Sequence, residues 1–260
     1  PHFFFIEGYC AWESDYNILQ NFLDLNPRSI EEGLIPMHAY GAENPHWWDA
    51  GRLVEITLQH KQLTSEIPES FGLLDKLEIL RLTGNMLSGS IPNSLTNLEN
   101  LRTLKLSSNN LSGEIPENIG ALTRLDSMML GDNLLEGNIP ESIGNMSSIK
   151  YLYFDGNSLT GSLPESIGNL ENIVILYLDN NKLTGKIPSS IGNLLTLQRL
   201  YLLNNCMTGE IPGEICNIYD SNPDFRTMLH NNRFVLPQPD CMSDGHIGYQ
   251  FDPHVECPFN

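Results

Sequence analysis

An asparagine recurs every 24 residues through the middle of the chain, and this period constrains the fold more than any other feature. The asparagines stand at Asn85, Asn109, Asn133, Asn157, Asn181 and Asn205. Glycine follows the same period from Gly89 to Gly209, and proline from Pro68 to Pro212. A fixed period of about 20 to 50 residues is typical of a solenoid, whose repeats bury their apolar faces only against their neighbours. We therefore expect one elongated stack of coils.

Within each repeat, the apolar residues predict one short strand. Leu104 and Leu106 alternate with polar residues, as in a strand with one buried face, and successive repeats would add parallel strands to a continuous sheet. Each asparagine side chain, turned inward, could bond the backbone of the loop that leaves its strand. The sequence predicts an α/β solenoid of 24-residue repeats.

The segment L-x-G-x-I-P-x-x-I-G-x-L occurs at 111–122, 159–170 (with Leu163 at the isoleucine position) and 183–194, and it resembles the plant-type class of leucine-rich repeats. Similar repeats occur in plant receptor-kinase ectodomains and in polygalacturonase-inhibiting proteins. The resemblance implies a leucine-rich repeat superhelix with a parallel β-sheet on the concave side, a second short strand after each asparagine, and 3₁₀ turns on the convex side. It also implies a protein that binds a ligand and is not an enzyme.

The segments that flank the repeats are expected to cap the stack. The expected divisions are an N-terminal cap over 1–52, seven repeats over 53–220, and a degenerate eighth repeat with a C-terminal cap over 221–260. In the first cap, Ser14 or Asp15 could cap a helix that ends at Asn26-Pro27. Residues 47–54 resemble the segment that precedes the first plant-type repeat, but this cap contains only Cys10 where the family commonly has paired cysteines.

The cysteines near the C-terminus predict a disulfide. Coils stacked at about 4.8 Å would separate Cys10 from every other cysteine by most of the length of the stack. The remaining cysteines are Cys206, Cys216, Cys241 and Cys257. Four cysteines allow three disulfide connectivities. Cys216 and Cys241 occupy nearly equivalent positions in consecutive coils, so their side chains would lie within disulfide-bonding distance. We expect a Cys216–Cys241 disulfide, an unpaired Cys10 and an oxidising compartment, with reduced thiols in the cytosol as the alternative.

Charge and motifs exclude several functions. The formal net charge of −18 disfavours nucleic acid and anionic membranes as partners. No apolar run approaches the roughly 18 residues of a membrane helix, although the chain could be the soluble part of an anchored protein. The sequence contains no metal-binding histidine motif, nucleophile elbow or phosphate-binding glycine loop, so we expect neither catalysis nor a cofactor.

The candidate binding residues are those that the repeat leaves variable. The residue between the second and third leucine of each repeat would point out of the concave sheet. In repeats four to seven, this column and its neighbours predict a patch of Met129, Tyr151, Tyr153, Ile175, Tyr177 and Tyr201, edged by Asp132, Asp155, Asp179 and Arg199. Exposed aromatic residues with arginine have the composition of a binding hot spot. The alternative is a tyrosine ladder that only stabilises neighbouring strands. Asp155 and Asp179 could hold a cation or a basic ligand group, or could be ordinary polar residues of the repeat.

The leading hypothesis is a non-catalytic extracellular recognition module, secreted or at the cell surface, that binds a protein, peptide or glycan on its concave or lateral face. Family resemblance also suggests an inhibitor of a secreted polysaccharide-degrading enzyme. A structural, adhesive or ice-contacting protein is the third hypothesis. Its only support is a threonine column with members at 64, 160, 184 and 208, which Glu136 interrupts.

Overall fold

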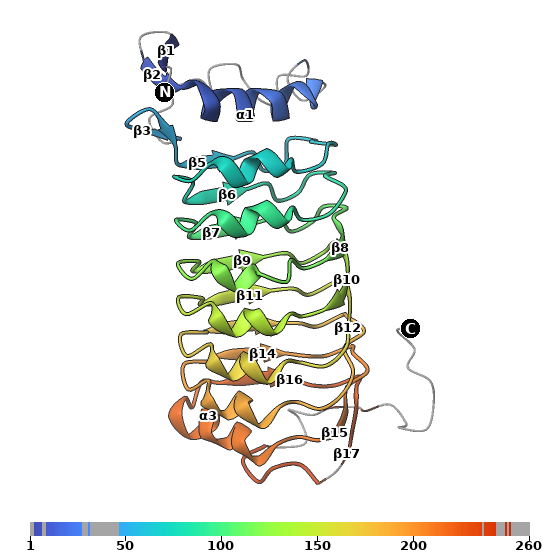
Figure 1. Ribbon diagram of the computed structural model, residues 1–260. Helices are drawn as coiled ribbons and strands as arrows, with labels where there is room; N and C mark the ends of the chain where they lie inside the picture. Colours follow the sequence, from blue (N-terminus) through green and yellow to red (C-terminus); the bar gives the residue numbers. More distant parts are fainter. Residues whose placement is uncertain are drawn as a thin grey trace.

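The chain folds as one stack of coils, which confirms the solenoid expected from the period (Figure 1). This computed structural model describes residues 3–6, 9–27, 31, 47–235, 237–242, 248 and 250. Helix α1 (Glu13–Asp24) lies across the N-terminal end of the stack. It follows an antiparallel pair, β1 (Phe3–Ile6) and β2 (Tyr9–Trp12). A second antiparallel pair, β3 (Trp48–Asp49) and β4 (Arg52–Leu53), leads into the first coil.

Eight parallel strands, one from each coil, form the concave sheet. In coil order they are β5 (Glu55–Thr57), β6 (Ile79–Arg81), β7 (Thr103–Lys105), β9 (Ser127–Met129), β11 (Tyr151–Tyr153), β13 (Ile175–Tyr177), β14 (Arg199–Tyr201) and β16 (Arg226–Met228). The middle residue of each strand is buried, whereas the third is at least partly exposed. The period therefore places residues 24 apart side by side from coil one to coil seven.

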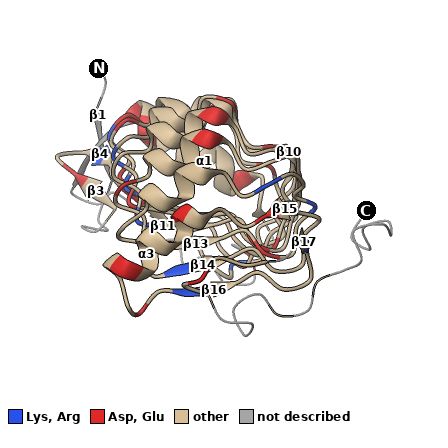
Figure 2. Cartoon of the chain, turned by 90° about the horizontal axis from the view of Figure 1, so that it is seen from below, with Lys and Arg blue, Asp and Glu red and all other residues tan. Residues whose placement is uncertain are grey.

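The other two sides of the coils are short second strands and 3₁₀ helices (Figure 2). The second strands are β8 (Ser112–Glu114), β10 (Leu134–Asn138) and β12 (Ser158–Thr160) in one parallel sheet, and β15 (Thr208–Glu210) with β17 (Arg233–Val235) in another. The helices are η2 (Glu69–Leu73), η3 (Asn93–Asn97), η4 (Ile119–Ala121), η5 (Glu141–Asn145), η6 (Glu165–Asn169), η7 (Ser189–Asn193) and η8 (Gly213–Ile215), which runs into α3 (Cys216–Ser221). Proline precedes most of these helices in an extended conformation, because its fixed φ suits the turn and no N–H is needed there.

The asparagines form a ladder of hydrogen bonds through the stack. In the fourth coil, the Oδ1 of Asn133 accepts from the backbone N–H of Leu111 at 3.0 Å. Its Nδ2 donates to the carbonyls of Leu106 at 3.1 Å and Leu130 at 3.0 Å, so one side chain serves two coils. The same bonds recur along the ladder, and all the predicted positions are buried except Asn157, which is only half-buried.

Replacing one of these asparagines should destabilise the protein. We expect Asn133→Ala to lower the free energy of unfolding by about 1 to 3 kcal/mol, because buried backbone groups lose their partner. Asn118→Ala is the control: Asn118 is exposed and makes no side-chain cap to η4. Urea unfolding measures both, and an equal small loss for the two variants would contradict the ladder's role.

The N-terminal cap is attached differently from our expectation. Helix α1 begins at Glu13, so Ser14 and Asp15 lie inside it and the predicted cap position is wrong. Asp15 is buried instead, and its Oδ2 accepts from the backbone N–H of Leu53 at 3.0 Å and from the Nε of Arg52 at 2.9 Å. One carboxylate thus joins the helix to the entrance of the first coil.

A further buried asparagine, just after α1, bonds the first coil from its N-terminal side. Asn26 is buried, and its Oδ1 accepts from the backbone N–H of Thr64 at 2.8 Å. Its Nδ2 donates to the carbonyl of Phe22 and to the hydroxyl of Ser65, both at 2.8 Å. In later coils the equivalent N–H groups of Ser88 and Ser112 donate to backbone carbonyls of the preceding coil, those of Ser65 and Gly89. The Asn26 side chain therefore takes the place of that carbonyl at the open edge of the first coil.

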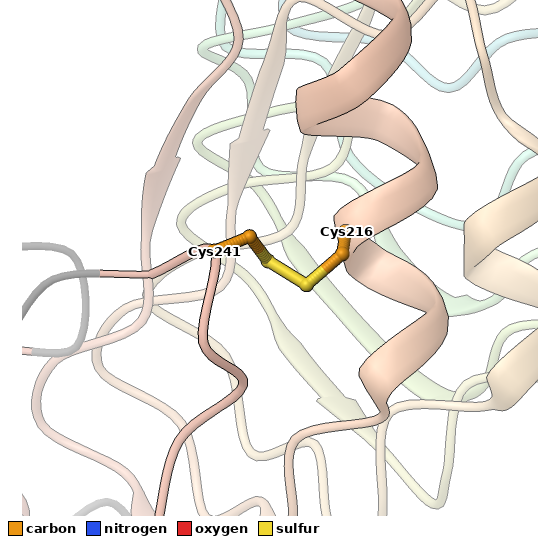
Figure 3. Close-up of a disulfide and its surroundings, with 2 residues drawn as sticks. All are labelled: Cys216 and Cys241. Atoms are coloured by element: carbon orange, nitrogen blue, oxygen red, sulfur yellow. A yellow bond between two sulfur atoms is a disulfide. The ribbon is translucent and has the colours of Figure 1, made fainter.

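At the other end of the stack, the structure contains the Cys216–Cys241 disulfide (Figure 3), with a Cα–Cα distance of 5.6 Å. The bridge joins the first residue of α3 in the seventh coil to the segment that follows β17 in the eighth. Cys206 is disulfide-bonded as well. The expectation for Cys10 and the pairing of Cys257 fall outside the residues whose side chains the structure describes. Among the described residues, we find no helix with the length and apolar character needed to cross a membrane.

Candidate functional site

Three tyrosines form a continuous aromatic surface on the concave sheet. Tyr153, Tyr177 and Tyr201, here called the tyrosine strip, are the third residues of β11, β13 and β14 and pair in register. The ring centroids of Tyr153 and Tyr177 are 4.9 Å apart at an interplanar angle of 79°. Those of Tyr177 and Tyr201 are 4.3 Å apart at 3°, so these rings stack. All three side chains are half-buried, which leaves part of each ring accessible to a ligand.

The strand geometry explains why these rings point outward. The preceding residues, Leu152, Leu176 and Leu200, are fully buried, and neighbouring positions of a strand face opposite sides. Met129 pairs with Tyr153 at one end of the strip, and Met228, which is 39% exposed, pairs with Tyr201 at the other.

A second column runs beside the tyrosine strip. Tyr151 pairs with Ile175, and Ile175 pairs with Arg199, each at the first position of its strand. Tyr151 is 37% exposed and Arg199 is exposed. The register thus places these predicted patch residues on one face of consecutive strands.

Two half-buried aspartates lie one coil apart just after the tyrosine strip. Burial raises the pKa of Asp155 to about 6, and the negative charges of Asp179 and Asp132 add to the increase. Burial also raises the pKa of Asp179, whose Oδ2 accepts a 2.6 Å hydrogen bond from the Nδ2 of Asn180. A cationic ligand group would relieve the repulsion among these carboxylates. In the described part of the chain, no group of three or more His, Cys, Asp and Glu residues is placed to hold a metal ion.

Tyr153 and Tyr177 of the tyrosine strip are uncharged near neutral pH. Burial raises the pKa of Tyr177 to about 12, and the neighbouring Tyr201 contributes to the increase. Burial also raises the pKa of Tyr153. These two tyrosines therefore offer aromatic faces and neutral hydroxyl groups beside the negatively charged aspartates.

A second asparagine ladder, which the sequence analysis missed, lies next to Asp179. The Nδ2 of Asn204 donates to the Oδ1 of Asn180, and the Nδ2 of Asn231 donates to the Oδ1 of Asn204, both at 2.6 Å. All three residues have positive φ, between 54° and 56°, a conformation that asparagine tolerates better than most residues. The signal was present in the sequence, because each of them directly precedes an asparagine of the main ladder.

Arg81, the basic residue of this column in the second coil, is engaged within the sheet. The Nη1 of Arg81 donates to the Oε1 of Glu55 at 3.1 Å, and the hydroxyl of Thr57 donates to the same oxygen at 2.7 Å. This end of the column is therefore polar, whereas its aromatic residues lie on the strands of coils five to seven.

Comparisons with known proteins agree with this architecture. Leucine-rich repeat family models match residues 51–111, 123–183 and 196–218. No curated protein sequence matches the chain. Several solved structures are similar over most of it. The PEPR1-AtPEP1 structure is 31% identical with a TM-score of 0.73, and the match covers 86% of this chain and 32% of that one. The Arabidopsis receptor kinase HAESA, solved with the peptide hormone IDA and the co-receptor SERK1, is 33% identical with a TM-score of 0.62, over 71% of this chain and 29% of that one.

The extent of these matches differs between relatives. The chain spans 28% to 32% of the length of the first receptor structures that it matches. A plant ice-binding protein matches over 92% of this chain and 94% of its own, with a TM-score of 0.56. Its identity is only 19%, so this likeness shows the fold alone.

Proposed function

The chain belongs to the leucine-rich repeat family of the plant type, and we propose that it is an extracellular recognition module that binds a peptide or protein ligand on its concave sheet. Similar structures include a plant peptide hormone receptor and HAESA in complex with a peptide hormone, which supports a peptide as the ligand class. The disulfides support a location outside the reducing cytosol.

The observation that carries the proposal is the tyrosine strip. Its rings are already packed against one another, so a ligand would order little additional structure when it binds. The accessible ring faces suit apolar or cationic side chains. Asp155 and Asp179 favour a positively charged group at the adjoining edge, and the exposed Arg199 offers a donor for a carbonyl or carboxylate.

The other hypotheses have weaker support. The ice-binding relative shares only the fold, and Glu136 interrupts the threonine column that would have to contact ice. Inhibition of a polysaccharide-degrading enzyme rests on family resemblance alone. A glycan could stack on the same rings, so a glycan ligand is a possible outcome of the experiment below.

Removing the central ring should weaken binding strongly. We expect Tyr177→Ala to reduce the affinity for peptides by at least about 2 kcal/mol, or roughly 30-fold, because the stacked surface loses its middle member. The peptides would come from a random display library selected on the immobilised wild-type chain, and calorimetry would measure their affinity. A glycan array tests the competing ligand class with the same variants.

Two variants serve as controls. Tyr177→Phe keeps the ring and should retain most of the affinity. Thr103→Ala lies on β7 outside the patch and should change the affinity less than twofold. Equal, small effects of Tyr177→Ala and Thr103→Ala, with both proteins folded, would show that the tyrosines stabilise the sheet and that the ligand binds elsewhere.

A further inference from the structure

A groove of about 840 Å³ runs along the stack through coils three to seven. Its lining includes four consecutive pairs of an aliphatic residue and a proline, which lie just before the 3₁₀ helices η5 to η8: 139–140, 163–164, 187–188 and 211–212. We call it the lateral groove. None of its lining residues belongs to the concave sheet, so it is separate from the tyrosine strip.

The floor of the lateral groove is apolar and pre-formed. Ile139, Leu163 and Ile187 are 3% to 4% exposed, so their side chains mainly fill the core. The prolines that follow them hold an extended backbone and have no N–H to offer a ligand. The floor is therefore rigid, and it offers a ligand only the small exposed part of each of these side chains.

The rim of the lateral groove is negatively charged. Its charged lining residues are five carboxylates, from Glu117, Glu141, Glu165, Glu210 and Glu214, and the single ammonium of Lys186. All five glutamates are exposed, and none forms an ion pair within the described part of the chain. An acidic rim without basic partners favours a cationic ligand.

Three of these glutamates form a column that hydrogen bonds hold in place. Glu117, Glu141 and Glu165 each follow the proline of their coil, so they recur at the coil spacing of about 5 Å. A serine from the next coil donates to the backbone carbonyl of each: Ser166 to Glu141 and Ser190 to Glu165, both at 2.7 Å, and Ser142 to Glu117. The backbone is thereby fixed from coil to coil, while the carboxylates line the groove.

We propose that the lateral groove binds an extended lysine- or arginine-rich peptide segment of a partner protein. A cationic ligand would form charge-assisted hydrogen bonds with the carboxylates of the column. The aliphatic stems of lysine and arginine would pack on the floor of isoleucine, leucine and proline. Four coils span about 15 Å, which an extended segment of about five residues covers. The net charge of −18 would steer such a segment toward the protein and disfavour anionic ligands.

Fluorescence anisotropy with a labelled peptide of alternating lysine and alanine, about eight residues long, tests the proposal on the full chain. We expect Glu141→Gln/Glu165→Gln to weaken binding about tenfold, because two carboxylates of the column lose their charge. The control is Glu99→Gln/Glu171→Gln, which changes the net charge equally at exposed positions outside the groove and should have less than a twofold effect.

The variants distinguish binding in the lateral groove from binding at the tyrosine strip. Tyr177→Ala should leave the affinity for the lysine peptide unchanged, because the tyrosine strip does not line the lateral groove. If the two double variants weaken peptide binding equally, the peptide is attracted to the acidic surface in general, and the proposal is overturned. It would also be overturned if the wild-type chain does not bind the lysine peptide, or binds a glutamate–alanine peptide equally well.

Discussion

Phe154→Ala is expected to lower the free energy of unfolding by about 3 to 5 kcal/mol, because it removes a fully buried ring from the middle of the stack. Phe154 occupies the last apolar position of the strand segment in the fifth coil, where the adjoining coils have Leu130 and Leu178. Its backbone N–H donates to the carbonyl of Tyr177 at 2.9 Å. Because each coil is stabilised only by its neighbours, the cavity would weaken both interfaces of the fifth coil.

The matched control is Phe154→Leu, which restores the residue found in the neighbouring coils. We expect this variant to lose less than about 1.5 kcal/mol, since an apolar side chain of similar volume still fills most of the space. Urea unfolding followed by circular dichroism measures both variants. Equal losses would show that the ring has no specific packing role, and a negligible loss for alanine would contradict the tight core.

Asp15→Ala should detach the N-terminal cap from the first coil at a cost of about 1 to 3 kcal/mol, because the buried N–H of Leu53 loses its acceptor. Asp15 is 1% exposed, and its removal leaves Arg52 and the backbone N–H of Leu53 without this carboxylate. Arg52 also pairs with Asp75, which is more exposed and cannot replace the bond to Leu53. The cap should therefore open while the central coils stay folded.

Hydrogen exchange measured peptide by peptide shows which segments of the chain lose protection when the cap opens. We expect faster exchange in α1 and β5 of Asp15→Ala and unchanged exchange in β11 and β13. Asp24→Ala removes an equal charge from the end of the same helix, where the exposed carboxylate bonds the side chain of Gln20, and should have little effect. Similar protection of α1 in both variants would show that the buried carboxylate does not hold the cap.

Much of the candidate site could be predicted because the repeat converts sequence distance into position. Residues 24 apart occupy the same place in consecutive coils, so the period alone assigns Tyr153, Tyr177 and Tyr201 to one column. The same argument brings Cys216 and Cys241 together, since they are 25 residues apart and nearly equivalent. The period could not predict how the rings meet, because one pair stacks and the other meets edge to face although both have the same spacing.

The sequence by itself therefore determined the solenoid, its register and the membership of each column, because all three follow from the period and from the need of each coil to bury its apolar face against the next. The tertiary structure decided what lies outside the period. Asp15 and Asn26 belong to no repeat, and only the packing of α1 on the first coil brings them to Leu53 and Thr64. Asn157 shares the period of the ladder yet is less buried, and the lateral groove exists only where several coils line up. Such features depend on distances between side chains in different coils, which a repeat pattern does not encode.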